Sequence, residues 1–306
     1  MKAGIVGAGA LGSLFAHIFQ RTGIPFSIYE KDQSIVDEIN TSGLSLAEND
    51  LTDIIHPSIN TKPGILTDAD IIILFVKSYS TDNAIKDILS SIKKDSIIVS
   101  LQNGLGNFET ITKYINEDRI VLGTTTIGAT KTGLSSVSFG GKGVITIGSS
   151  SSESIEAADN LFSKAGLQFT RVFNPHIAVW KKAVVNAGIN PIAAILDIKN
   201  GDILQIPYAM ELQKQLVTES VNTAKAAGIP LDIDIMLNEV NETCLKTSAN
   251  ICSMLQDISN GRKTEIDSII GAVIETASHH NIPVPVSETI YLLIKGLESK
   301  KTTIII

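Results

Sequence analysis

The sequence predicts an α/β protein with an N-terminal Rossmann-type doubly wound parallel sheet and a C-terminal all-helical domain. Three observations support this fold class. A glycine-rich loop follows the first apolar run, β-rich runs then alternate with helical patterns, and only helical periodicity follows from about residue 174. We therefore expect a dinucleotide-binding domain over residues 1–173 and a helical domain over residues 174–306.

The elements of the first half are short apolar strands separated by helical patterns. Strands are expected at residues 2–7, 25–30, 69–78, 95–104 and 119–129, and a helix is expected over residues 10–23. The run "ADIIILFVKS" at 69–78 has almost no polar interruption, which is typical of a central parallel strand buried on both faces. Residues 133–149 are expected to form two strands joined as a hairpin.

Helical periodicity dominates the second half up to about residue 299, with breaks at 227–232 and 281–287. The segment "WKKAVVNAGINP" at 180–191 is expected to be a kinked helix, because the apolar pattern continues beyond Pro191 although the residue before a proline avoids the α region. The last residues, "KKTTIII", are apolar and fit either a frayed tail or a strand packed on a neighbour.

Composition and charge exclude several classes of protein. The 306 residues are 43% hydrophobic and 19% charged, which supports large cores and argues against disorder. The net charge is −7 with scattered Lys and Arg, so we expect no binding of nucleic acid or membrane surfaces. Cys244 and Cys252 form no CxxC motif, and no signal peptide or membrane-spanning run is evident, which fits a cytoplasmic protein. The long helices and the apolar tail favour a homodimer.

The stretch "GAGALG" has the GxGxxG spacing of a dinucleotide-binding loop. Its glycines allow a tight turn, close approach of a diphosphate to the backbone, and close packing of helix on strand. The helix that follows offers free N–H groups to the anion. A tight turn without a ligand is the alternative interpretation. We assign the cofactor loop to six residues, which are Gly7, Ala8, Gly9, Ala10, Leu11 and Gly12.

Two charges at the end of the second strand bear on the choice of cofactor. Glu30 lies eighteen residues after Gly12, where an acid that binds an unphosphorylated ribose is expected, and this favours NAD. Lys31 would instead pair with a 2′-phosphate, which favours NADP. Either side chain could also be an ordinary solvated loop charge, so the residues alone leave the cofactor open.

Two polar side chains follow the next strands of the predicted sheet. Lys77 ends the run "FVKS" and Asn103 ends the run "LQNG". Ligands of open α/β sheets bind beyond the carboxyl ends of the strands, so both residues are candidates to border the cofactor. Asn103 and Gly104 could also simply make a turn, since Asn-Gly is a common turn pair.

A stripe of three polar side chains runs along the helix at 180–191. Lys182, Asn186 and Asn190 are four residues apart and share one face, although their neighbours are apolar. Lys182 could be a surface lysine with a buried stem, but asparagine is a poor helix former, which argues for a functional stripe. Glu265 lies at the start of a later helix, where a carboxylate could also act only through the helix dipole.

Four motifs carry a resemblance to a known family: "GAGALG", "QNG" at 102–104, "WKK" with the two asparagines of the stripe, and "SMLQD" followed by "TEID" within 253–267. In this order, and over residues 2 to about 299, the chain resembles the ketopantoate reductase (2-dehydropantoate 2-reductase) family. That family reduces the ketone of 2-dehydropantoate to (R)-pantoate with NADPH, on the route to pantothenate and coenzyme A. The resemblance therefore implies a reductase of a small 2-keto acid.

The resemblance also implies roles for single residues. Lys182 matches the family's general-acid lysine, Glu265 the glutamate that works with it, and Lys77 a cofactor-side lysine. The positions that match substrate-binding residues are Asn103, Asn186, Asn190, Asn200, Asn250 and Ser253. The family often has arginine where this chain has Lys31, and Glu30 departs from the pattern. NADP is therefore expected, with NAD possible because of Glu30.

The expected chemistry explains why the stripe is polar. Hydride addition to a ketone places negative charge on the oxygen, and an ammonium within reach stabilises that charge and donates the proton. Burial lowers the pKa of a lysine, and we expect Glu265 to oppose this shift at Lys182.

Three alternative functions stay open. The first is an NAD-dependent D-2-hydroxyacid (mandelate-type) dehydrogenase on the same scaffold, which Glu30 favours. The second is a relative of the glycerol-3-phosphate or 6-phosphogluconate dehydrogenases, although Arg262 is the only arginine of the helical half. The third is a non-catalytic dinucleotide sensor, which would not need Lys182 and Glu265 together.

Overall fold

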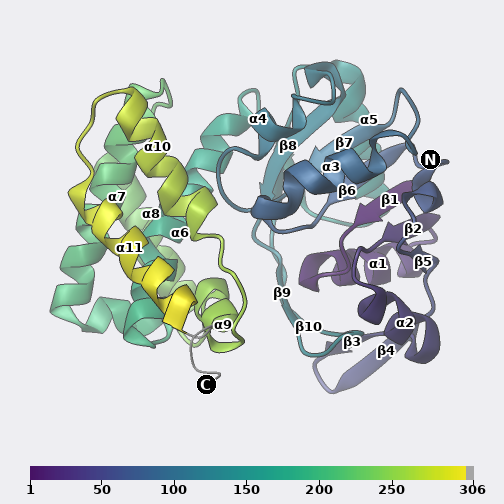
Figure 1. Ribbon diagram of the computed structural model, residues 1–306, viewed down its shortest axis with the longest axis horizontal. Coiled ribbons are helices and arrows are strands. Elements are labelled where there is room, and N and C mark those ends of the chain that lie inside the picture. The colour runs from purple at the N-terminus through teal and green to yellow at the C-terminus, as the bar shows by residue number, and fades with distance from the viewer. Residues whose placement is uncertain (301–306) are drawn as a thin grey trace. The chain divides into compact units, whose positions relative to one another are not determined.

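The computed structural model describes residues 1–300 and divides them into two compact units (Figure 1). The first unit comprises Met1–Gln102 and Asn107–Pro175, and the second comprises Asn103–Gly106 and the chain from His176 onward. The apolar tail lies at 301–306, outside the described residues. Within the described part, no helix is both long enough and apolar enough to span a bilayer.

A large, mostly parallel sheet forms the centre of the first unit. Its eight strands in residues 1–300 follow the order β12-β11-β8-β7-β6-β1-β2-β5, and every neighbouring pair is parallel except β11 with β8. The strands are β1 (Ala3–Val6), β2 (Phe26–Tyr29), β5 (Ile59–Asn60), β6 (Ile71–Leu74), β7 (Ile97–Ser100), β8 (Ile120–Thr125), β11 (Ile145–Gly148) and β12 (Phe169–Arg171). All four residues of β6 are buried, as its apolar run predicts.

Helices cover both faces of this sheet, because successive strand residues point to opposite sides. Ile5 and Ile73 pack with Phe15 of α1, whereas the next residues, Val6 and Leu74, belong to a separate cluster on the other face. The helices are α1 (Ala10–Arg21), α2 (Gln33–Ser42), α3 (Thr81–Leu89), α4 (Asn107–Ile111) and α5 (Ser152–Lys164), with short 3-10 turns η1 (Pro63–Leu66), η2 (Ser78–Ser80) and η3 (Glu117–Arg119). The doubly wound fold class is thus confirmed.

A second sheet in the first unit corrects one expectation. It has the order β4-β3-β10-β9, from β3 (Leu44–Glu48), β4 (Leu51–Ile55), β9 (Gly128–Lys131) and β10 (Ser136–Gly141). The expected hairpin over 133–149 is wrong, because β10 pairs with β9 and β3 whereas β11 pairs with β8 and β12. The chain crosses between sheets at Gly143, where a Cβ would overlap the backbone of Thr126 and Ile127.

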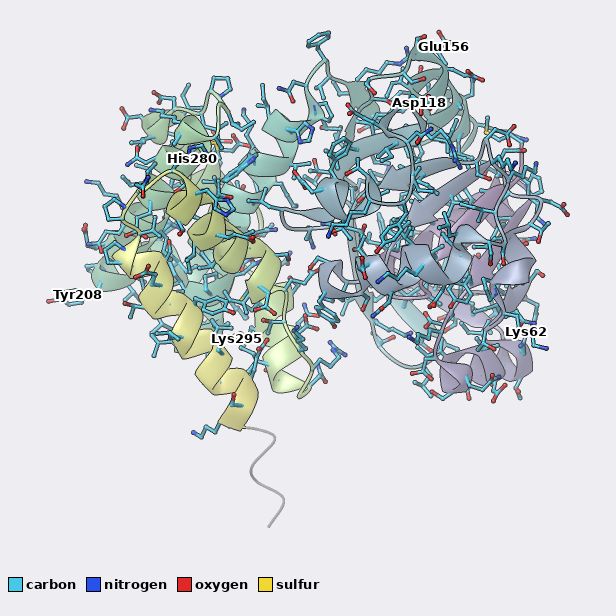
Figure 2. All side chains as sticks on the ribbon, turned by 45° about the horizontal axis from the view of Figure 1, so that its top comes forward. Lys62, Asp118, Glu156, Tyr208, His280 and Lys295 are labelled. Atoms are coloured by element: carbon cyan, nitrogen blue, oxygen red, sulfur yellow. The ribbon has the colours of Figure 1, made fainter. Side chains whose placement is uncertain are left out.

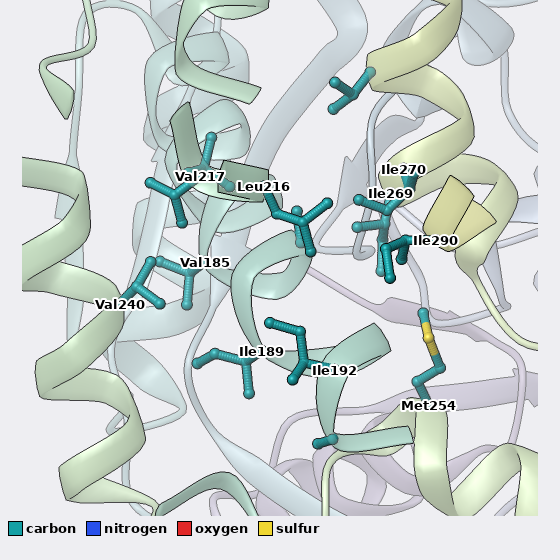
Figure 3. Close-up of a cluster of buried hydrophobic side chains, with 14 of the residues drawn as sticks. Val185, Ile189, Ile192, Leu216, Val217, Val240, Met254, Ile269, Ile270 and Ile290 are labelled. Carbon is teal, nitrogen blue, oxygen red and sulfur yellow. The ribbon is translucent and has the colours of Figure 1, made fainter. Parts of the chain in front are cut away.

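The second unit is helical and surrounds one central helix, α6 (Pro175–Leu196). Pro191 lies inside α6, so the helix does continue past the proline as expected. The other helices are η4 (Asn200–Gln205), α7 (Pro207–Ala226), α8 (Ile233–Lys246), α9 (Ser253–Ser259), the π-helical turn η5 (Asp267–Gly271), α10 (Ala272–His279) and α11 (Pro285–Lys300). Figure 3 shows Val185, Ile189 and Ile192 of α6 in the apolar core they share with these helices.

Candidate active site

The glycine loop between β1 and α1 has the backbone geometry that its spacing predicts. Gly7 has φ +98°, a conformation that side chains with a Cβ rarely adopt. A Cβ on Gly12 would overlap the carbonyl oxygen of Gly7, so only glycine lets the first turn of α1 lie this close to β1. Gly9 precedes α1 without a side-chain cap, which leaves the N-terminus of the helix open to an anion. The loop therefore fits a dinucleotide diphosphate.

The Glu30 carboxylate is held in place beside this loop. Its Oε2 accepts a hydrogen bond of 2.7 Å from the backbone N–H of Ala8, and its Oε1 accepts one of 3.0 Å from that of Asp32. Lys31 is exposed. Glu30 thus lies at the end of β2 next to the second residue of the loop, where the sequence places a ribose-binding acid.

Lys131 is a cation near the loop that the sequence reasoning missed. It ends β9, and its Nζ donates a hydrogen bond of 2.9 Å to the carbonyl oxygen of Ala8. No motif pointed to it, because the sheet that contains β9 was not expected. Lys131 and Glu30 both bind the main chain of Ala8, and Lys31 follows Glu30 in the sequence. Two positive charges therefore lie close to the negative Glu30.

The two polar residues expected beyond the strand ends fall in different units. Lys77 follows β6 and precedes η2 in the first unit, whereas Asn103 belongs to the second unit. Gly104 has φ +84°, so the Asn-Gly pair does make a turn. The turn also brings Asn103 Nδ2 to 3.5 Å from Glu265 Oε2, and Leu105 N–H donates to Ser268 O at 2.8 Å. The turn interpretation is therefore confirmed, and contact of Asn103 with the cofactor stays a prediction.

Lys182 lies on α6, partly exposed, and burial lowers the pKa of its ammonium. Desolvation is the cause of this direction, and the opposing effect expected from Glu265 stays a prediction. On the same face, Asn186 is partly exposed and Asn190 is 8% exposed. A lysine whose pKa is lowered by burial releases its proton closer to neutral pH than an exposed one.

Three of the expected substrate-binding asparagines meet around the chain that connects α8 to α9. Asn200 N–H donates to Asn250 O at 3.1 Å, and Asn200 Nδ2 donates to Thr247 Oγ1 at 2.9 Å. The Sγ of Cys252, the residue before Ser253, donates to Asn190 O at 3.4 Å. Asn200 itself is 7% exposed, and among the described residues its buried Oδ1 has no hydrogen-bond partner. Such an acceptor is suited to a hydroxyl group of a ligand.

Glu265 is 6% exposed and lies two residues before the π-helical turn η5. Single π-helical turns inside helices occur frequently at functional sites. Its main-chain carbonyl accepts from the N–H groups of Ser268 and Ile269 at 3.1 Å each. The structure thus joins Glu265 with Asn103 in one group, and Asn190, Asn200 and Asn250 in another.

Comparison with known proteins gives a consistent result along the chain. Residues 3–152 match the family model described as ketopantoate reductase PanE/ApbA, and residues 177–298 match its C-terminal model. A 2-dehydropantoate 2-reductase of Pyrococcus horikoshii is 37% identical over 307 residues, covering 98% of each chain.

Two solved structures are similar over the same length. A ternary structure of D-mandelate dehydrogenase with NADH and anilino(oxo)acetate has a TM-score of 0.94 at 28% identity, covering 99% of this chain and 100% of that one. A PanE/ApbA family ketopantoate reductase from Ralstonia eutropha has a TM-score of 0.89 at 25% identity, with the same coverage.

Proposed function

The chain belongs to the ketopantoate reductase family, and from this premise we propose that it reduces the ketone of 2-dehydropantoate to (R)-pantoate. The observation that carries the proposal is Lys182, an ammonium whose pKa is lowered by burial on the polar face of α6. A proton donor of this kind is what ketone reduction needs. A protein that only sensed a dinucleotide would gain nothing from it.

In the proposed mechanism, the glycine loop binds the cofactor and Lys182 of α6 donates the proton. When bound at the glycine loop, the nicotinamide dinucleotide supplies the hydride. Lys182 stabilises the negative charge that develops on the ketone oxygen and donates the proton to it. The amide side chains of Asn186, Asn190 and Asn200 bind substrate oxygens without adding charge. Glu265, with Asn103 at 3.5 Å, orients the reacting groups.

The remaining assignments belong to the same proposal. Asn250 and Ser253 bind the carboxylate end of the substrate, and Lys77 lies on the cofactor side. We assign cofactor binding to residues 1–173 and substrate binding to the helical part that follows. Exposed apolar side chains such as Tyr208 (Figure 2) and Leu292 support a homodimer, and the free cysteines support a cytoplasmic location. Light scattering of the purified chain would measure its oligomeric state.

For the cofactor we propose NADPH, with NADH used as well. Lys31 and Lys131 supply positive charge near the loop, which favours a 2′-phosphate. The fixed Glu30 carboxylate repels that phosphate and accepts hydrogen bonds from an unphosphorylated ribose. Because these charges act in opposite directions, we expect a smaller preference for NADPH over NADH than the family resemblance implies.

A second candidate function is a D-2-hydroxyacid dehydrogenase of the mandelate type. Two observations favour it: the fixed Glu30 and the TM-score of 0.94 to the D-mandelate dehydrogenase structure with NADH. The same lysine would then protonate a different 2-keto acid.

Steady-state kinetics with purified protein separate the two functions. Ketopantoate and benzoylformate are each reduced with NADPH and with NADH, and kcat/KM is compared across the four combinations. We expect the highest value for ketopantoate with NADPH. A higher kcat/KM for benzoylformate would establish the second candidate, and dinucleotide binding without any turnover would establish a sensor.

A further inference from the structure

The "TEID" segment at Thr264–Asp267 contains two polar residues, Thr264 and Asp267, that the proposed mechanism does not use. They flank Glu265 on either side, and both are held by side chains of α11, far along the chain. Thr264 is fully buried and Glu265 nearly so. These contacts therefore act directly on the segment that carries the Glu265 carboxylate.

Glu298 of α11 holds the residue before Glu265. Its Oε1 accepts hydrogen bonds from Thr264 N–H at 2.8 Å and from Thr264 Oγ1 at 2.7 Å. The same hydroxyl accepts from Ile266 N–H at 3.2 Å, so the backbone on both sides of Glu265 is fixed. Burial raises the pKa of Glu298, but its hydrogen bonds with Thr264 and Lys295 outweigh this effect and hold the pKa below its usual value. Glu298 is therefore ionised at neutral pH and accepts strong hydrogen bonds.

Asp267, two residues after Glu265, is held by the same helix. Tyr291 OH donates to its Oδ1 at 2.9 Å, and Lys295 Nζ lies 3.3 Å from the same oxygen. Lys295, labelled in Figure 2, also lies 2.9 Å from Glu298 Oε2, so one ammonium joins the contacts on both sides of Glu265. The ring of Tyr291 lies against Gly271, where a Cβ would be 3.2 Å from it, at the end of the π-helical turn.

We propose that Tyr291, Lys295 and Glu298, which we name the α11 clamp, position the Glu265 carboxylate for the reaction. The inference rests on the proposed function, because it assigns these residues an effect only through Glu265. The π-helical turn η5 begins two residues after Glu265, and such turns are rare, so we infer that external contacts hold this segment in one conformation. The clamp supplies them from Thr264 through to Gly271. Its members are positioning residues, not catalytic ones.

A double-mutant cycle tests this inference. Glu298→Gln weakens the hydrogen bonds to Thr264 and the pairing with Lys295 while keeping the shape of the side chain. We expect kcat to fall by about tenfold, because a small misplacement of a reacting group is costly, and KM for the dinucleotide to change by less than about twofold. In a Glu265→Gln background the same substitution should lower kcat by less than about twofold, since the group it positions is already altered.

Three further variants make the outcome decisive. Glu288→Gln removes an exposed carboxylate from the same helix and should leave kcat unchanged. Thr264→Ser keeps the hydroxyl and should keep most of the turnover, whereas Thr264→Val should behave like Glu298→Gln. Equal proportional losses of kcat in both backgrounds, or losses that follow only the melting temperature, would overturn the inference. If the wild-type chain prefers another 2-keto acid, the proposed function fails while the same cycle, run with that acid, still tests the clamp.

Discussion

Lys182 is a residue at which burial acts in opposite directions on stability and on catalysis. Burial lowers the pKa of its ammonium, so the folded chain binds that proton less tightly than the unfolded chain. The charged ammonium lowers the free energy of unfolding, and this destabilisation is fully present below the lowered pKa. It disappears as pH rises through the window between that pKa and the 10.5 of an ordinary lysine. Below that lowered pKa, the folded protein therefore carries an unfavourable charge that the proposed chemistry requires.

Replacing this charge tests both effects at once. Lys182→Met keeps the length of the side chain, and we expect kcat to fall by about 10²–10⁴ while the free energy of unfolding rises by about 1 kcal/mol. Kinetics and urea denaturation measure the two quantities. Lys181→Met is the matched control, because the partly exposed Lys181 side chain has its Nζ 3.7 Å from Glu239 Oε2 in a solvent-accessible ion pair. A Lys182→Met chain that keeps its turnover would remove Lys182 from the mechanism.

Glu30 and Lys31 should determine the cofactor preference with opposite signs. Glu30→Gln removes the negative charge near the ribose, and we expect the ratio of kcat/KM for NADPH to that for NADH to rise by about tenfold, the effect of about 1.4 kcal/mol. Lys31→Gln should lower the same ratio. Kinetics with both cofactors measure it, and an unchanged ratio in both variants would mean that neither side chain reaches the ribose.

At the scale of elements, the sequence predicted those whose signal is local. The glycine spacing predicted the start of α1, and the continuous apolar run predicted β6. The hairpin over 133–149 failed because alternating residues look the same whether two strands pair with each other or with different sheets. Contacts between distant elements, such as Lys131 with the glycine loop and Glu298 with Thr264, leave no local pattern at all.

The junction of β1 and α1 gives a prediction at this scale. Gly12→Ala places a Cβ on the carbonyl oxygen of Gly7, and backbone cannot move aside as a side chain can. We expect the chain to lose about 1–3 kcal/mol of stability and at least about tenfold in dinucleotide affinity, measured by denaturation and by fluorescence titration. Gly64→Ala is the control, since a Cβ there meets open space. Normal affinity in the Gly12→Ala chain would contradict the assignment of the loop.

At the scale of the whole molecule, the order of strands and helices was enough to predict the α/β class and the helical second part. The sequence did not predict which unit one short segment belongs to. The sequence predicted a strand over 95–104, but β7 ends at Ser100 and Asn103–Gly106 groups with the second unit. A Cβ on Gly104 would lie 2.6 Å from Ser268 Cβ, so this grouping depends on packing against a segment about 160 residues away.

The central claim is that Lys182 donates the proton, and the pH dependence of kcat for ketopantoate reduction tests it most directly. A proton donor must be protonated, so kcat should fall as pH rises through the lowered pKa of Lys182, below the 10.5 of an ordinary lysine. Lys182→Arg holds its proton throughout, and this alkaline decline should be absent from the slower variant. The same decline in both proteins, or none below pH 10.5 in the wild-type chain, would contradict the account.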